Sequence, residues 1–287
     1  MNQEILVIGV GGSGSNTINR MGDLGIVGVK RIAMNTDIQH LERINADKKL
    51  LIGKSTTKGY GAGSNPEVGE KAAREQEEEI RKEVKNADLV FITCGLGGGT
   101  GTGASPVIAE ICKNEGILTV AVVTLPFTSE GYVRRENAFA GLEKLKNTVD
   151  TIIVIPNDKL LSVVPNLPLD NAFKVSDDVL SRAVKGIAEL VTIPGLINLD
   201  LADLKTVLKN GGYAMIGLGE SKIDTKTEER ALVAVQTALS SPLLDVDLST
   251  VNRALINVVG GEDMTLREAE LIPNEVCSRI HPEAHII

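Results

Sequence analysis

The chain has 287 residues and a formal net charge of −8, from 30 Lys and Arg against 38 Asp and Glu. A hydrophobic fraction of 43% excludes a disordered chain, and the length predicts two domains. The acidic balance and the few aromatic residues (four Phe, three Tyr, no Trp) argue against nucleic-acid binding.

The first half of the chain alternates β-rich runs with helical segments. Strands are predicted at residues 4–10, 29–34, 89–94, 118–124 and 151–155, and helices at residues 16–23, 65–84 and 107–114. Several of the β-rich runs are continuously apolar, which is typical of parallel strands covered on both faces. The alternation predicts an open α/β sheet with right-handed crossovers.

The second half has a different pattern. A long amphipathic helix is predicted at residues 173–191, ending before Pro194-Gly195. Further helices are predicted at residues 202–210 and 228–239, with strands at 213–218 and 254–259. We therefore expect a domain over residues 1–172, a central linking helix over 173–191, and a smaller α+β domain over 192–287.

Membrane insertion and metal or disulfide sites find no support in the sequence. There is no run of about 18 apolar residues and no signal peptide, so we expect a cytoplasmic protein. The cysteines Cys94, Cys112 and Cys277 are scattered without C-x-x-C spacing. This usage favours a reducing compartment and predicts neither a zinc site nor a disulfide framework.

The first glycine-rich segment is Gly9-Val10-Gly11-Gly12-Ser13-Gly14, between a predicted strand and a predicted helix. Together with Asp37 it matches the dinucleotide-binding pattern G-x-G-x-x-G. Backbone N–H groups at a helix N-terminus predict an anion site. The segment alone leaves open the pyrophosphate of NAD, a nucleotide phosphate, or a tight turn without a ligand.

A second glycine-containing segment, Gly53-Lys54-Ser55, resembles the end of a P-loop. That motif requires a glycine five residues before Gly53, where this chain has Lys48. We therefore expect an ordinary exposed loop.

The third segment runs from Gly95 to Pro106 and reads GLGGGTGTGASP. It lies between a predicted core strand and a predicted helix, where a solvent linker is not expected. Its glycines let backbone N–H groups fold around an anion, and Thr100 and Thr102 add hydroxyl donors. Of the three segments, it is the strongest candidate for a phosphate site.

Residues 97–103 read GGGTGTG, the signature of the tubulin/FtsZ family. Further matching segments follow the family's order at residues 11–16, 35–37, 61–67, 155–157 and 194–203. The chain thus resembles this family over essentially its whole length, and its prokaryotic FtsZ branch more than eukaryotic tubulin. The resemblance implies a Rossmann-like parallel-sheet GTPase domain, GTP and GDP as ligands, Mg²⁺ or K⁺ as the assisting cation, and head-to-tail polymerisation into the filaments of the mid-cell division ring.

The resemblance also implies contacts with the nucleotide, residue by residue. The phosphate contacts expected from it are Gly12, Ser13, Gly14, Ser15, Asn16, Ala62, Gly63, Gly99, Thr100 and Gly101. The ribose, phosphate and base contacts are Glu130, Arg134, Asn157, Phe173 and Asp177.

Two of these residues have a simple chemical reason for their assignment, and three have a structural alternative. Phe173 offers a ring for stacking, and the Asp177 carboxylate can accept from guanine N1–H and the exocyclic amine together, which favours guanine over adenine. For Asp177 the alternative is a favourable charge in the first turns of a helix. For Glu130 and Arg134 it is an i,i+4 surface ion pair.

Asn198, Asp200 and Asp203 resemble the loop that one subunit inserts into the nucleotide pocket of the next. The resemblance implies that the two carboxylates orient a water molecule and bind a hydrated cation, so that the GTPase site is completed between subunits. From the residues alone, D-x-x-D before a helical run is a helix-capping pattern.

Two other functions are weighed against this one. A tubulin-like regulator that binds GTP with little turnover is disfavoured by the presence of Asp200 and Asp203. An NAD-dependent oxidoreductase would need a catalytic His or Tyr in the second domain. The histidines are His40, His281 and His285, and only His40 lies in the expected nucleotide domain, with no evident carboxylate partner.

The chain departs from the usual family pattern in a few places. Cys94, Leu96, Tyr60 and Thr128-Ser129 replace commoner residues without removing a needed donor or carboxylate. Family members also continue beyond the position of residue 287. We therefore expect an incomplete second domain that lacks the tail by which membrane tethers are bound.

Overall fold

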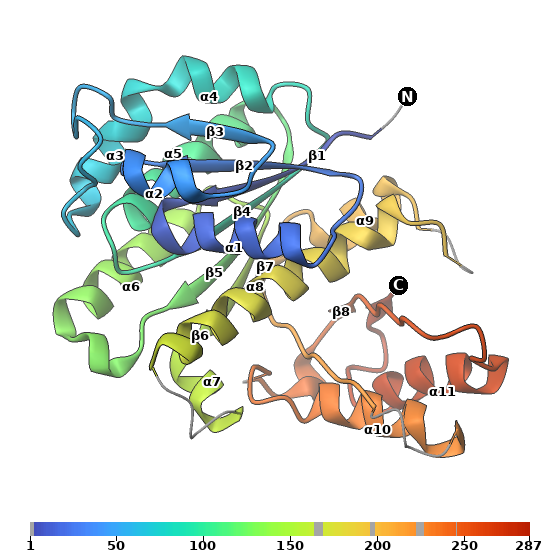
Figure 1. The fold of residues 1–287 in the computed structure, drawn as a ribbon. Coiled ribbons are helices and arrows are strands. Elements are labelled where there is room, and N and C mark those ends of the chain that lie inside the picture. The colour runs from blue at the N-terminus through green and yellow to red at the C-terminus, as the bar shows by residue number, and fades with distance from the viewer. Residues whose placement is uncertain (1–2, 164–168, 196–198, 222–226, 245) are drawn as a thin grey trace. The chain divides into compact units, whose positions relative to one another are not determined.

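Seven strands form one sheet in the order β3-β2-β1-β4-β5-β6-β7, and every neighbouring pair is parallel (Figure 1). The computed structural model describes residues 3–163, 169–195, 199–221, 227–244 and 246–287. The strands are β1 Ile5–Val10, β2 Val29–Asn35, β3 Lys48–Leu51, β4 Leu89–Gly95, β5 Leu118–Leu125, β6 Thr151–Pro156 and β7 Gly212–Ala214. The predicted parallel α/β sheet is therefore confirmed.

Helices cover both faces of this sheet. They are α1 Gly11–Asp23, α2 Ile38–Arg43, α3 Pro66–Glu75, α4 Glu77–Val84, α5 Thr100–Asn114, α6 Tyr132–Lys146, α7 Asn157–Val163 and α8 Leu169–Thr192, with a short 3-10 helix η1 at Thr128–Glu130. Helix α9 Leu201–Leu208 follows them in the chain. Helix α5 packs on β1, β4 and β5 and also contacts α3, α4 and α6. Helix α1 packs on β1, β2 and β4 and contacts α8.

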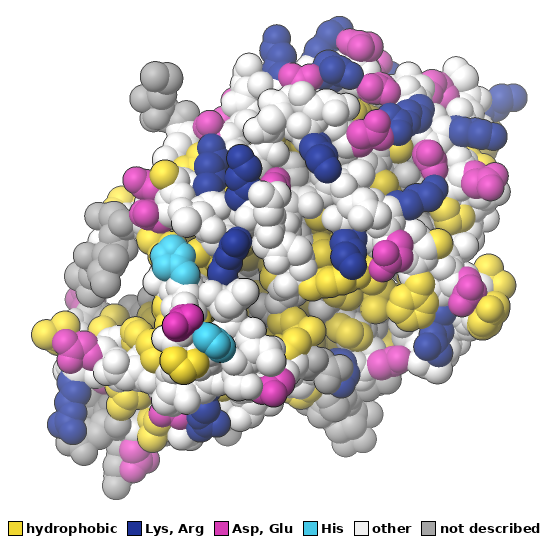
Figure 2. Space-filling view, turned by 180° about the vertical axis from the view of Figure 1, so that it is seen from behind, with side chains coloured by type: hydrophobic (Ala, Val, Ile, Leu, Met, Phe, Trp, Pro, Cys, Tyr) yellow, Lys and Arg dark blue, Asp and Glu magenta, His cyan; other side chains and the backbone are white. Residues whose placement is uncertain are grey.

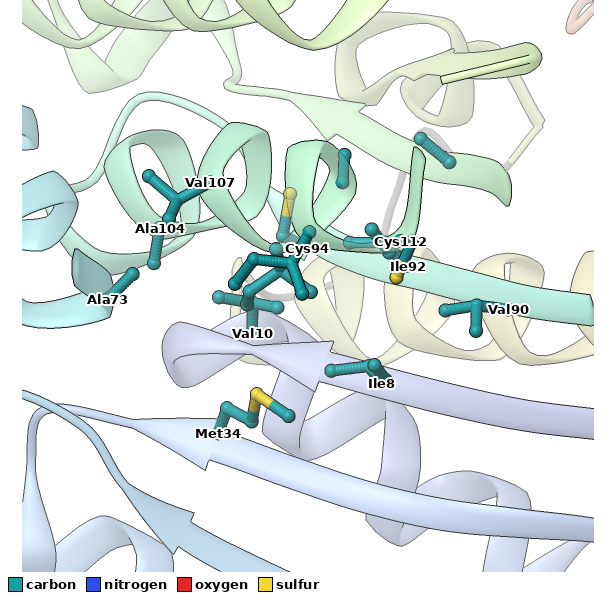
Figure 3. Close-up of a cluster of buried hydrophobic side chains, with 14 of the residues drawn as sticks. Ile8, Val10, Met34, Ala73, Val90, Ile92, Cys94, Ala104, Val107 and Cys112 are labelled. Carbon is teal, nitrogen blue, oxygen red and sulfur yellow. The ribbon is translucent and has the colours of Figure 1, made fainter. Parts of the chain in front are cut away.

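The core lies between the sheet and helix α5 (Figure 3). Ile8 and Val10 of β1, and Ile92 and Cys94 of β4, are fully buried there. Every residue of β1 is buried, which is the outcome expected for a strand covered on both faces. Burial also raises the pKa of the Cys94 thiol to about 12, so Cys94 acts as a small core side chain.

Several predicted elements differ from the observed ones. The helix expected over residues 65–84 is two helices, α3 and α4, separated at Gln76 (φ −105°, ψ 21°). The side chain of Gln76 accepts a hydrogen bond from the backbone N–H of Gly53, which explains the break. The strand expected at residues 213–218 is shorter and belongs to the main sheet, where Gly212–Ala214 pairs with β6. Helices α2, α6 and α7, helix α11 at Leu266–Cys277 and strand β3 were not predicted.

The chain divides into two compact units. The first comprises Met1–Leu201 and Leu208–Ala214, and the second comprises Ala202–Val207 and Met215–Ile287. Helix α8 lies in the first unit. The functional domain boundaries given above stay a prediction.

The second unit is built on helices α10 Thr227–Leu239 and α11 Leu266–Cys277. Its small core contains Val235, Val276 and Ile280. The strand expected at residues 254–259 is only β8 Arg253–Ala254, paired in parallel with β9 His285–Ile286. The Thr265–Glu268 capping box starts α11, a sequence signal that could have revealed this helix.

The molecular surface is mixed in charge. On the face shown in Figure 2, Lys and Arg side chains are interspersed with Asp and Glu side chains. Within the described part of the chain, no helix combines the length and the hydropathy needed to cross a bilayer.

Candidate nucleotide-binding site

The predicted phosphate segments follow two neighbouring strands. Gly11 comes directly after β1, and Gly95 ends β4, which pairs with β1 in parallel. The strand order reverses here, since β2 and β3 lie on one side of β1 while β5 and β6 lie beyond β4. Such a switch point at the carboxyl edge is the usual ligand site of an open α/β sheet.

The two glycine-rich segments meet at this edge. Gly11 has φ +73°, and a Cβ on it would lie 2.8 Å from the backbone nitrogen of Gly101. Helix α1 begins at Gly11, earlier than the predicted residue 16, and α5 begins at Thr100, earlier than the predicted residue 107. Gly12–Asn16 and Thr100–Gly101 therefore lie in the first turns of two helices, where unpaired N–H groups favour an anion.

The segment at residues 61–67, which carries Ala62 and Gly63, lies against these two glycine-rich segments. A Cβ on Gly99 would lie 2.8 Å from the Cβ of Ala62. The hydroxyl oxygens of Thr36 and Thr100 are 2.6 Å apart in a buried hydrogen bond. The structure thus brings the three predicted phosphate segments together.

Some glycines of the 95–106 segment have a packing role. A Cβ on Gly103 would lie 1.9 Å from the carbonyl oxygen of Pro66, so this glycine lets α5 approach α3 at backbone distance. The buried hydroxyl of Thr102, expected as an anion donor, accepts the N–H of Gly97 at 2.8 Å and so holds the turn. By contrast, a Cβ on Gly12 or Gly98 would have no neighbour within 4 Å.

Asp177 of α8 faces the start of α1. The hydroxyl of Ser13 donates to its carboxylate at 3.4 Å. Burial raises the pKa of Asp177 to about 7, and the Ser13 hydrogen bond only partly opposes this shift. A carboxyl group with a near-neutral pKa at such an edge is a functional candidate, because neutral pH then populates both protonation states.

Two aromatic rings and one amide lie near the start of α8. Phe173 is 37% exposed, and its ring meets that of Phe127 edge-on, with centroids 5.3 Å apart and an interplanar angle of 81°. Asn157, the first residue of α7 directly after β6, is buried, and its carboxamide oxygen accepts a hydrogen bond from the Ser176 hydroxyl at 2.8 Å. This contact joins α7 to α8.

Glu130 and Arg134 form the i,i+4 ion pair that was the alternative interpretation for them. Glu130 also accepts the N–H of Phe127 at 2.8 Å, which fixes the turn after β5. Their contacts with a nucleotide stay a prediction.

The three predicted catalytic residues are placed only in part. Asn198 lies outside the described residues. Asp200 directly precedes α9, and Asp203 lies in the first turn of that helix. Within the described chain, no group of three or more His, Cys, Asp or Glu side chains could hold a metal ion.

The turn at Gly53-Lys54-Ser55 already contains an anion from the protein itself. The exposed Glu75 carboxylate accepts the N–H of Ser55 at 2.7 Å, and the N–H and hydroxyl of Thr56 at 2.9 and 2.7 Å. These hydrogen bonds lower the pKa of Glu75 to about 2. The turn is thus a closed structural motif, in agreement with the sequence argument against a P-loop.

Sequence reasoning missed one residue of this edge. His40 is hydrogen-bonded through its Nε2 to the carboxamide oxygen of Asn16 at 3.1 Å. The available signal was the Asn35-Thr36-Asp37 segment, whose Asp37 caps α2 three residues before His40.

Family models and known proteins match this chain over most of its length. The model "Tubulin/FtsZ family, GTPase domain" matches residues 4–165, and "FtsZ family, C-terminal domain" matches residues 212–287. Cell division protein FtsZ 1 of Archaeoglobus fulgidus is 59% identical to this chain, over 99% of this chain and 76% of its own length. Cell division protein FtsZ 1 of Thermococcus kodakarensis is 60% identical, over 99% of this chain and 75% of its own length. The solved structure "FtsZ dimer, empty (M. jannaschii)" matches 100% of this chain and 82% of its own, with a TM-score of 0.96 and 57% identity.

Proposed function

The chain belongs to the tubulin/FtsZ family, and from this premise we propose that its nucleotide lies at the carboxyl edge of the sheet. The chain is a GTPase of cell division, in keeping with its GTPase domain and its closely similar relatives. The observation that carries the placement is the meeting of three phosphate segments around Gly99 and Gly101.

The edge offers the donors and acceptors that GTP requires. The first turns of α1 and α5 supply N–H groups to the phosphates, with Ala62 and Gly63 beside the terminal one. At the other end, Phe173 stacks on the guanine, and ionised Asp177 accepts from its N1–H and amino group. Asn157, Glu130 and Arg134 contact the sugar and phosphates.

Hydrolysis is a phosphoryl transfer to water. The water oxygen bonds to the terminal phosphorus as the bond to the bridging oxygen breaks, and GDP carries that oxygen away. One proton of the water passes to solvent and the other stays on the inorganic phosphate. We assign Asp200 and Asp203 of a neighbouring subunit, with Asn198, to holding this water in line and to balancing charge. This assignment explains why turnover would depend on assembly.

A cation accompanies this chemistry. Mg²⁺ takes oxygen ligands and is commonly bound by substrate phosphates with only one or two protein carboxylates. The absence of a three-ligand cluster in the described chain is compatible with such binding. We propose Mg²⁺ as the phosphate-bound ion, with K⁺ as the alternative cation beside the two aspartates.

Self-association into filaments follows from the family. We propose that the contacts are head to tail and that the filaments act in the cytoplasm at mid-cell.

The test is GTP turnover as a function of protein concentration. We expect the specific activity to rise steeply at the assembly threshold, because each site needs a second subunit. Activity that stays flat across the threshold would refute a site completed in trans.

A mixing experiment sharpens the assignment. Asp203→Ala keeps the nucleotide pocket but lacks the donated carboxylate, whereas Asp177→Ala keeps the donated loop but lacks the guanine acceptor. We expect each variant alone to be nearly inactive and the mixture to regain part of the turnover. Loss of GTP binding by monomeric Asp203→Ala would contradict a role in trans.

A further inference from the structure

We propose that His40 is a positioning residue of the nucleotide site, which holds the Asn16 carboxamide so that it presents only N–H donors to the nucleotide. This inference rests on the proposed function. Asn16 lies in the first turns of α1, within the first phosphate segment, and His40 lies in α2.

The orientation starts from Asn35 at the end of β2. Its carboxamide oxygen accepts the N–H of Thr36 at 2.8 Å and that of Asp37 at 3.4 Å. Asn35 is buried, so its amide is fixed by these two bonds. The remaining amino group therefore faces Nδ1 of His40, 3.2 Å away.

This contact determines the tautomer of His40. Because an amide N–H₂ group can only donate, Nδ1 of His40 must accept, and the ring hydrogen lies on Nε2. The backbone of His40 is held by the N-cap of α2, since its N–H donates to the Asp37 carboxylate at 3.0 Å.

The last link reaches the site. Nε2–H of His40 donates to the carboxamide oxygen of Asn16 at 3.1 Å, which leaves the Asn16 amino group as the part that can contact a ligand. Phosphate oxygens, ribose oxygens and purine ring nitrogens are acceptors, so this orientation fits a nucleotide. Without His40, the amide could rotate and present its oxygen to these acceptors.

Calorimetric titration of GTP below the assembly threshold tests the inference. We expect His40→Ala and Asn16→Ala each to raise the Kd about three- to tenfold, the effect of one solvent-accessible hydrogen bond. The double variant should bind no more weakly than Asn16→Ala alone. His40→Gln, whose amide can still donate, should restore most of the affinity, and His281→Ala in the second unit should stay within about twofold of wild type.

A wild-type affinity in His40→Ala, or losses that simply add in the double variant, would overturn the inference while leaving the proposed function intact. A wild type without GTP affinity would overturn both. If His40→Ala fails to fold, ¹⁵N-histidine NMR of the wild type tests the inference by identifying the tautomer of His40. The Nε2–H tautomer of His40 is expected, and the Nδ1–H tautomer would contradict the relay.

Discussion

Two amide-rich turns of the first unit differ in what they do with an anion. In the turn at residues 53–57, Glu75 occupies the N–H groups of Ser55 and Thr56. At the edge formed by the starts of α1 and α5, Gly12 and Gly98 face open space. Both turns carry glycine and hydroxyl residues, so composition does not separate them. Such a turn can accept a ligand anion only where the protein does not supply its own carboxylate.

The largest expected effect is the loss of stability when a methyl group is added to a glycine that lets two helices pack closely. Gly103→Ala forces a methyl group to within 1.9 Å of the Pro66 carbonyl oxygen, so α3 and α5 must move apart. We expect a loss of about 3 kcal/mol in the free energy of unfolding, measured by denaturant titration.

Gly98→Ala is the matched control in the same segment, because its methyl group meets nothing within 4 Å. It should change stability by less than about 0.5 kcal/mol and weaken GTP binding instead. Equal stability losses in the two variants would show that the whole segment serves packing.

The next effect is the pH dependence of GTP binding at the edge formed by the starts of α1 and α5. In the proposed site, guanine is bound by the ionised form of Asp177, whose pKa is raised to about 7 by burial. We therefore expect the Kd for GTP to rise about tenfold for each pH unit below about 7 and to level off above it, as measured by calorimetry. Asp177→Asn should bind weakly and remove this component of the pH dependence.

Without nucleotide, the free energy of unfolding should fall as pH rises towards about 7, whereas the affinity for GTP should increase over the same range. The pKa of Asp177 is higher in the folded than in the unfolded protein, so the folded state retains its proton to a higher pH. The favourable contribution is complete below about 4 and is lost as pH rises towards about 7. For the binding prediction, a GTP affinity that is constant between about pH 6 and 8 would contradict the role assigned to Asp177.

The smallest effect concerns the closed turn. Glu75→Ala should lower the free energy of unfolding by about 1 kcal/mol, because water replaces the lost carboxylate at this exposed position. Since the pKa of Glu75 is lowered to about 2, its contribution is complete at neutral pH and fades as pH falls from about 4.5 towards 2.

Phosphate binding by Glu75→Ala tests whether the closed turn differs from the edge only because Glu75 occupies it. With Glu75 removed, inorganic phosphate should raise the melting temperature of Glu75→Ala slightly more than that of wild type, because the emptied turn can accept an anion. The isosteric Glu75→Gln, whose carbonyl can still accept, should show a smaller response. An identical response in all three proteins would mean that the turn is no anion site even when emptied.

Local patterns predicted much of the fold. The continuous apolar runs of β1, β4, β5 and β6 gave correct strands, because burial on both faces leaves a clear trace in sequence. Helix α6 was missed, since Tyr132 and Phe139 are exposed and blur its apolar stripe. The break at Gln76 was missed because it depends on a hydrogen bond to Gly53, far away in the chain.

Glycine spacing and strand patterning are local properties, so they were enough to predict the fold class, the family and the segments proposed to bind the phosphates. The packed structure was needed to distinguish the glycines that let helices approach one another from those with open space around them. It also decided that Glu75 closes one turn, that Ser13 meets Asp177 across 164 residues, and that Asn35, His40 and Asn16 form a chain of hydrogen bonds. Such contacts join distant parts of the chain and depend on side-chain directions that only the packed sheet and helices fix.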